Sequence, residues 1–159
     1  MQGLQKEYKK WQRWFDLIWE DVQQQMRFLE IYKDLSVENI QGDRMKFIEE
    51  CYFVQAAVAL RRQFGIQKDE ISLMKLLIQI KAEFSKIPQN CRLTEDELNS
   101  FIKTVQNIEN KLGLYIDRKI VHMDKRPIAS DLDRKGMLAA LQSLAQIVGA
   151  LHQFFFHNQ

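Results

Sequence analysis

Apolar residues recur at steps of three and four along most of this chain, and that period predicts α-helices. Polar breaks and two prolines divide the pattern into helices that we expect at 4–35, 43–64, 72–87, 94–123 and 131–155. These segments lack the strict alternation that is typical of half-buried strands. The sequence therefore predicts an all-α fold, a bundle of about five helices in a single domain spanning residues 1–159.

Two of these helices have candidate buried faces that follow directly from the spacing. In the first helix the predicted face comprises Trp11, Phe15, Ile18, Trp19, Val22, Met26, Leu29 and Tyr32. In the second it comprises Phe47, Cys51, Val54 and Val58, with Leu60 or Arg61. Because Cys51 lies on this apolar face, we expect its thiol to be buried as a small hydrophobic group.

Several helix ends are marked by single residues. Gly65 is placed where a left-handed residue would end the second helix. Pro88 disfavours helix in the residue before it, which predicts that the third helix ends at Ile87. Thr94 and Glu97 have the spacing of a capping box, which predicts the start of the fourth helix.

Composition excludes several classes of protein. The formal charge is only +2, which does not by itself indicate a nucleic-acid binder. Two cysteines cannot form a disulfide framework in a chain of 159 residues, and no Cys/His spacing matches a metal site, so we expect neither a metal nor a cofactor. The N-terminal residues lack an apolar signal core, and no uncharged apolar run reaches the roughly 18 residues of a membrane span. These features predict a cytoplasmic protein without membrane contact.

Ionisable chemistry is concentrated at the end of the fourth helix, in residues 115–127. Arg118 and His122 are one turn apart, and Tyr115 is one turn further back. A histidine exchanges protons near neutrality, and an arginine binds phosphate through a planar fork of donors. Together they are the minimum parts for metal-free phosphodiester cleavage. The alternative is structural: a histidine near a helix C-terminus suits the dipole, and the basic run then remains solvated.

The segment Tyr115-Ile-Asp-Arg-Lys-Ile-Val-His122-Met-Asp-Lys resembles the signature of the HEPN superfamily, and most of all its bacterial abortive-infection U-type branch. Residues 47–77 resemble the paired-helix middle of that family, so the likeness covers about two-thirds of the chain. It implies an all-α fold, RNA or a nucleotide as ligand, and a role in bacterial defence or toxin–antitoxin systems. It also implies a homodimer with paired fourth helices, and a partner protein such as an antitoxin.

One departure from the family pattern concerns activity. In HEPN ribonucleases an arginine precedes the polar residue of the motif; aligning Asp117 with that polar residue puts Ile116 in the arginine's place. If the chain is a ribonuclease, the resemblance implies that His122 transfers protons and Arg118 binds the phosphate, with Tyr115 and Asp117 orienting them. The alternative is a catalytically inactive dimeric binding or scaffold module.

Basic residues around this segment are candidates for RNA binding. They are Lys119, Lys125 and Arg126 beside the motif, and Arg61 and Arg62 near the end of the second helix. For the last two the competing interpretation is a structural ion pair with Asp69 or Glu70 across the following turn.

Overall fold

The structure is a computed structural model that describes residues 2–37, 42–87, 92–121 and 131–156. Its elements are α1 (Gln2–Val37), α2 (Asp43–Arg62), α3 (Leu73–Ala82), the 3₁₀ turn η1 (Phe84–Lys86), α4 (Glu95–Val121), α5 (Asp131–Leu151) and the π-helical turn η2 (His152–Phe156). All regular structure within the described ranges is helical, so the predicted all-α bundle is confirmed.

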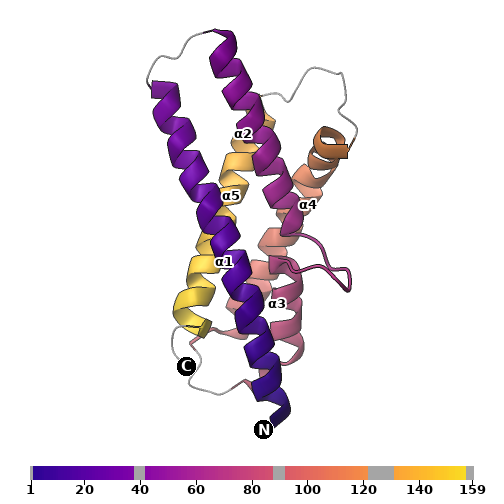
Figure 1. The fold of residues 1–159 in the computed structure, drawn as a ribbon. Coiled ribbons are helices and arrows are strands. Elements are labelled where there is room, and N and C mark those ends of the chain that lie inside the picture. Colours follow the sequence, from indigo (N-terminus) through magenta and orange to yellow (C-terminus); the bar gives the residue numbers. More distant parts are fainter. Residues whose placement is uncertain (1, 38–41, 88–91, 122–130, 157–159) are drawn as a thin grey trace.

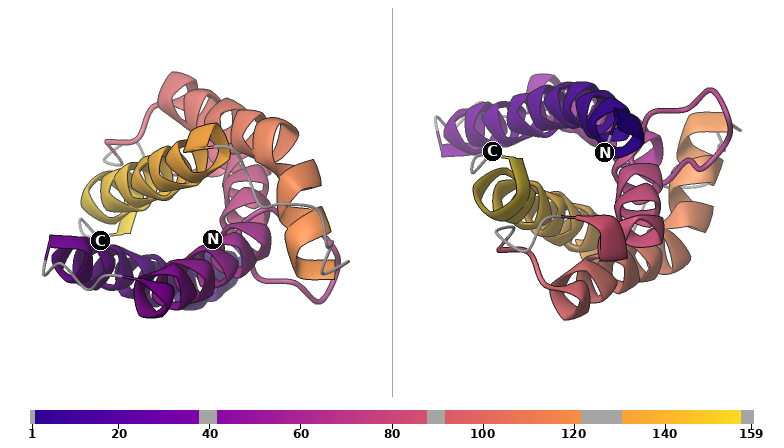
Figure 2. Two further views of the ribbon diagram at one scale, coloured as in Figure 1. Left: turned by 90° about the horizontal axis from the view of Figure 1, so that it is seen from above. Right: turned by 90° about the horizontal axis from the view of Figure 1, so that it is seen from below.

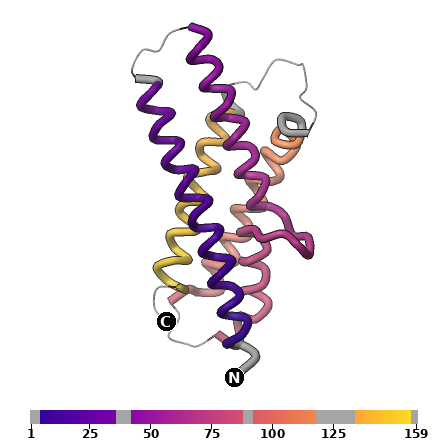
Figure 3. The backbone as a smooth tube through the Cα atoms, viewed as in Figure 1, coloured from indigo at the N-terminus to yellow at the C-terminus, as the bar shows by residue number. Residues whose placement is uncertain are grey.

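The long helices run up and down one bundle axis (Figure 1). Helices α1 and α2 lie side by side as an antiparallel pair, and α5 faces them (Figure 2). Helix α4 packs against both α2 and α5, and the short α3 fills the space between α1 and α4. Helices α2 and α3 run in the same direction, joined by a loop that projects from the side of the bundle (Figure 3).

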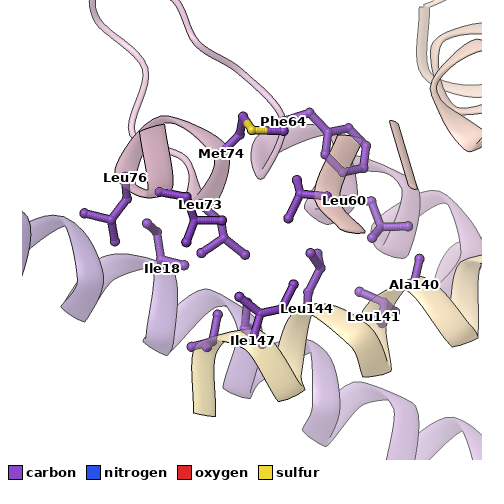
Figure 4. Close-up of a cluster of buried hydrophobic side chains, with 14 of the residues drawn as sticks. Ile18, Leu60, Phe64, Leu73, Met74, Leu76, Ala140, Leu141, Leu144 and Ile147 are labelled. Atoms are coloured by element: carbon purple, nitrogen blue, oxygen red, sulfur yellow. The ribbon is translucent and has the colours of Figure 1, made fainter. Parts of the chain in front are cut away.

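The core lies where α1, α2, α3 and α5 converge. Figure 4 shows Ile18, Leu60, Leu73 and Leu144 directed toward one another from these four helices. Each of them is at most 2% exposed. Burying a leucine side chain of this kind contributes about 1.5 to 3 kcal/mol, so side chains from four helices stabilise a common centre.

Helix α5 supplies a long apolar face to the bundle. The segment Arg134–Phe156 has the length and mean hydropathy of a membrane-spanning helix. However, its apolar side chains are those that pack in the bundle's centre, as in the core helix of a globular protein. They are Met137, Leu141, Leu144, Ile147, Val148 and Leu151.

The predicted capping box at the start of α4 is present. The Thr94 amide donates to Glu97 Oε2 at 2.8 Å, and the Glu97 amide donates to Thr94 Oγ1 at 3.2 Å. The bond from the Thr94 amide, followed by the one from its hydroxyl, lowers the pKa of the Glu97 carboxyl. These reciprocal bonds satisfy amides that the first helical turn leaves unpaired.

Two of the predicted helix ends are wrong. Helix α3 stops at Ala82, and the chain continues as the 3₁₀ turn to Lys86, with Ile87 extended before the proline. Gly65 does not adopt a left-handed conformation; among the described glycines the positive φ, 86°, belongs to Gly42 before α2. The carbonyl of Gly65 instead accepts the Ser72 hydroxyl, which closes the loop between α2 and α3.

The predicted buried face of α2 is wrong except at Leu60, which is fully buried. Phe47 is 68% exposed and Cys51 lies at the surface, while Tyr52 and Phe53 on the other side are 7% exposed. The buried face includes Ala56, Ala57, Ala59 and Leu60. Helix α2 contacts α1, α4 and α5, and small alanine side chains allow three neighbours to approach closely. Spacing alone could not select this face, because apolar residues occur around most of the helix.

The buried stripe of α1 contains one polar residue that the sequence did not predict. Trp11, Phe15, Ile18, Val22 and Leu29 are buried as expected. Gln25 continues their spacing and is 2% exposed, and its amide nitrogen and oxygen form no hydrogen bond within the described residues. A buried amide without partners destabilises a fold.

Replacing this glutamine by an apolar residue should therefore stabilise the protein. We expect Gln25→Leu to raise the free energy of unfolding by about 1 to 3 kcal/mol in urea denaturation. The matched control is Gln24→Leu at the exposed neighbouring position, which should change stability by less than about 0.5 kcal/mol. A loss of stability in Gln25→Leu would show that the amide has a stabilising role.

Candidate functional site

The position that corresponds to the expected catalytic arginine lies in the core. Ile116 is 0% exposed, and Leu112, one turn earlier on α4, is 7% exposed. A guanidinium at position 116 would be removed from water, and burying a charge in this way is costly. The bundle therefore packs this position of α4 inward, and the isoleucine belongs to the hydrophobic core.

The adjacent acid, Asp117, binds an arginine of another helix. Arg61 Nε lies 3.0 Å from Asp117 Oδ1, and its Nη1 lies 3.9 Å from Glu109 Oε1. All three side chains are between 41% and 48% exposed. Ion pairs this exposed contribute about 0 to 1 kcal/mol each, so the cluster fixes side-chain positions more than it stabilises the fold.

Arg62 is directed to a different helix. Its Nη2 donates to Asp21 Oδ1 on α1 at 2.7 Å, and the buried Gln63 donates to the other oxygen of the same carboxylate at 2.8 Å. The two neighbouring arginines thus bind acids on opposite sides of α2. Asp69 and Glu70 were the expected partners. Instead, Arg61 binds carboxylates of α4, and Arg62 binds a carboxylate of α1.

The remaining predicted site residues are described only in part. Tyr115 is half-buried and packs against the core. Arg118 and Lys119 belong to the backbone of α4, but their side chains lie outside the described residues. His122, Lys125 and Arg126 also lie outside the described residues. The structure thus brings together Asp117 and Arg61, and the predicted His122–Arg118 pair stays a prediction.

A second polar cluster was not predicted. Tyr32 Oη donates to Glu49 Oε1 at 3.2 Å, and Arg134 Nη1 donates to the same oxygen at 2.6 Å. The guanidinium carbon of Arg134 lies 5.2 Å from the centre of the Phe53 ring. The Tyr52 ring stacks on Tyr32 with centroids 4.6 Å apart. The acceptor is 17 residues from one donor and 85 from the other, so no local sequence pattern could have revealed the cluster.

Burial alters the acidity of these tyrosines. Desolvation, followed by the neighbouring Tyr32, raises the pKa of Tyr52 to about 12. Desolvation and the charge of Glu49 raise the pKa of Tyr32 as well. Both hydroxyls therefore stay protonated at neutral pH, and the cluster is better suited to holding three helices together than to proton transfer.

The described residues contain no group of three or more histidines, cysteines or acids that could hold a metal ion. No family model, curated protein or solved structure matches this chain. The resemblance of residues 115–125 to the HEPN signature therefore remains a prediction from the sequence.

Burial of Ile116 leads to a direct test of its structural role. We expect Ile116→Arg to lower the free energy of unfolding by about 3 to 5 kcal/mol, because it buries a charge without a partner. The matched control is Leu114→Arg on the same helix, where the side chain is 67% exposed. That variant should stay within about 0.5 kcal/mol of the wild type. Urea denaturation measures both; equal stability of the two variants would contradict the burial of Ile116.

The raised tyrosine pKa predicts a loss of stability in alkali. Between pH 10 and about 12 the unfolded chain loses the Tyr52 proton while the folded chain keeps it, so the free energy of unfolding falls as the pH rises. In Tyr52→Phe this fall should be shallower. At pH 8 the variant should be no less stable than the wild type, because the Tyr52 hydroxyl has no hydrogen-bond partner among the described residues. Urea denaturation at pH 8 and at a series of pH values above 10 tests this. If the free energy of unfolding falls as steeply with pH in Tyr52→Phe as in the wild type, the prediction is wrong.

Proposed function

We propose that this chain is a HEPN-like binding module that engages RNA or a nucleotide near the end of α4 and has no ribonuclease activity of its own. The complete burial of Ile116 carries the proposal. A phosphate-binding arginine must reach a solvent-filled cleft, and this position of α4 packs into the core.

The proposed biological setting comes from the sequence resemblance. It is a cytoplasmic protein of bacterial defence or toxin–antitoxin type that forms a homodimer and has a partner protein such as an antitoxin. In this proposal Lys119, Lys125 and Arg126 supply the cations for the phosphate backbone. Arg61 and Arg62 contribute less, because each is already bound to a carboxylate.

A ribonuclease is the second candidate function. It would use Arg118 for the phosphate and His122 for proton transfer, with Tyr115 and Asp117 orienting them. One observation favours it: pairing with Arg61 neutralises Asp117, which removes a negative charge that would repel a phosphate bound at the adjacent Arg118.

Cleavage and binding assays on the same preparations separate the two candidates. Purified protein incubated with total RNA should leave the RNA intact, and His122→Ala should behave identically. Cleavage by the wild type that His122→Ala abolishes would establish the ribonuclease and overturn the inactive module.

Binding is measured by the fluorescence anisotropy of a labelled single-stranded RNA. The double variant Lys125→Ala/Arg126→Ala should bind more weakly, and the slope of log affinity against log salt should fall by roughly 0.7 per lost phosphate contact. The control is Lys103→Ala, an exposed lysine on the N-terminal half of α4. The proposed ligand would be wrong if the wild type fails to bind RNA, or if the control weakens binding as much as the double variant does.

A further inference from the structure

The outward side of α2 presents an apolar row that stays exposed among the residues the structure describes. We call Phe47, Cys51, Val54 and Val58 the α2 stripe. Phe47 is 68%, Val54 47% and Val58 36% exposed, and Cys51 is classed with them as exposed. Scattered apolar residues on a surface are ordinary, but a contiguous row of them marks an interaction site.

The spacing of the α2 stripe is that of a helix–helix seam. Its members follow one another at steps of four, three and four residues. A step that alternates between three and four keeps a row of side chains on one line along a helix. The natural partner of such a row is a second helix that carries an equivalent row.

The stripe is complementary to itself. Its outer pair, Phe47 and Val58, and its inner pair, Cys51 and Val54, share the same midpoint along α2. A two-fold axis through that midpoint would place Phe47 against Val58 of a second copy, and Cys51 against Val54. An isologous interface requires this symmetry, and it sets the large ring against a small side chain.

Charges at the two ends of the stripe favour the same arrangement. The N-terminal end carries Asp43 with Arg44 and Lys46, and is positive on balance. At the C-terminal end Arg61 is bound to Glu109 and Asp117, and this group is negative on balance. An antiparallel pair brings the positive end of one copy to the negative end of the other, and it also opposes the helix dipoles.

We propose that the α2 stripe is the interface between two copies of this chain, with the two α2 helices antiparallel about a two-fold axis. The inference rests on the homodimer of the proposed function and assigns its surface to α2, in place of paired fourth helices. Four side chains on one helix cover less than the roughly 800 Å² per partner of a standard interface. The dimer should therefore dissociate on dilution, with a dissociation constant in the micromolar range or weaker.

Sedimentation equilibrium from low to high micromolar concentration tests the assignment. The wild type in reducing buffer should show a monomer–dimer equilibrium. Val54→Asp should be monomeric at every concentration, with unchanged circular dichroism and melting temperature, because an exposed aspartate does not disturb the monomer. The matched control is Leu17→Asp on α1, where the leucine is 54% exposed; it should dimerise like the wild type.

Cross-linking through Cys51 tests whether the stripes of the two copies face each other. About the proposed axis the two Cys51 residues are three residues out of step, which is about 4.5 Å along the helices. In a Cys91→Ser background, a dimaleimide with a short spacer should link two chains. Moving the thiol to α1 in Cys51→Ser/Leu17→Cys/Cys91→Ser should abolish the link.

The possible failures point to different conclusions. A wild type that is monomeric at all concentrations overturns both the α2 interface and the proposed homodimer, and assigns the stripe to a different protein. A dimer that Val54→Asp leaves intact keeps the homodimer and overturns the α2 assignment. A dimer that fails to cross-link through Cys51 overturns the antiparallel arrangement.

Discussion

Packing of α5 against α1, α2 and α4 is the constraint on which the rest of the structure depends. The apolar face of α5 is long, and the bundle can remove it from water only by surrounding it with neighbours. Helix α1 meets it with its own buried stripe, and α2 meets it with alanines and Leu60. Once these contacts form, the rotation of every long helix about its axis is set. The orientation of each side chain that matters for function follows from that rotation.

The two most consequential side-chain placements are results of this constraint. On α4 it turns Ile116 into the core, so the arginine of a ribonuclease motif has no place there. On α2 it buries Tyr52 and Phe53 and leaves Phe47 and Val54 outside. The same packing thus buries position 116 of α4 and leaves an apolar row of α2 exposed. In the two proposals above, RNA binds mainly near the end of α4, and a second copy of the chain binds to α2.

Polar contacts refine this arrangement without determining it. The pairs of Arg61 with Asp117 and of Arg62 with Asp21 link α2 to α4 and to α1, at exposed positions where such pairs contribute little energy. Glu49 is less exposed and binds both Tyr32 and Arg134, which ties α1, α2 and α5 together. Such contacts select among similar packings, because a helix rotated by one position would lose them. Gln25 is the exception, since its buried amide has no partner among the described residues.

The sequence by itself determined the helical class, most helix limits, the buried stripe of α1 and the capping box at Thr94, because these depend on neighbours within a few residues. It also located the charged segment from Tyr115 onward and the unusual isoleucine at position 116. Only the tertiary structure decided which side of α2 is buried: residues 47–60 are apolar around most of the helix, so their period allows two faces. It likewise decided the partners of Arg61, Arg62 and Glu49, which are distant in sequence. The spacing of apolar residues within a segment predicts that it forms a helix, and packing against three neighbouring helices decides which face of α2 is buried.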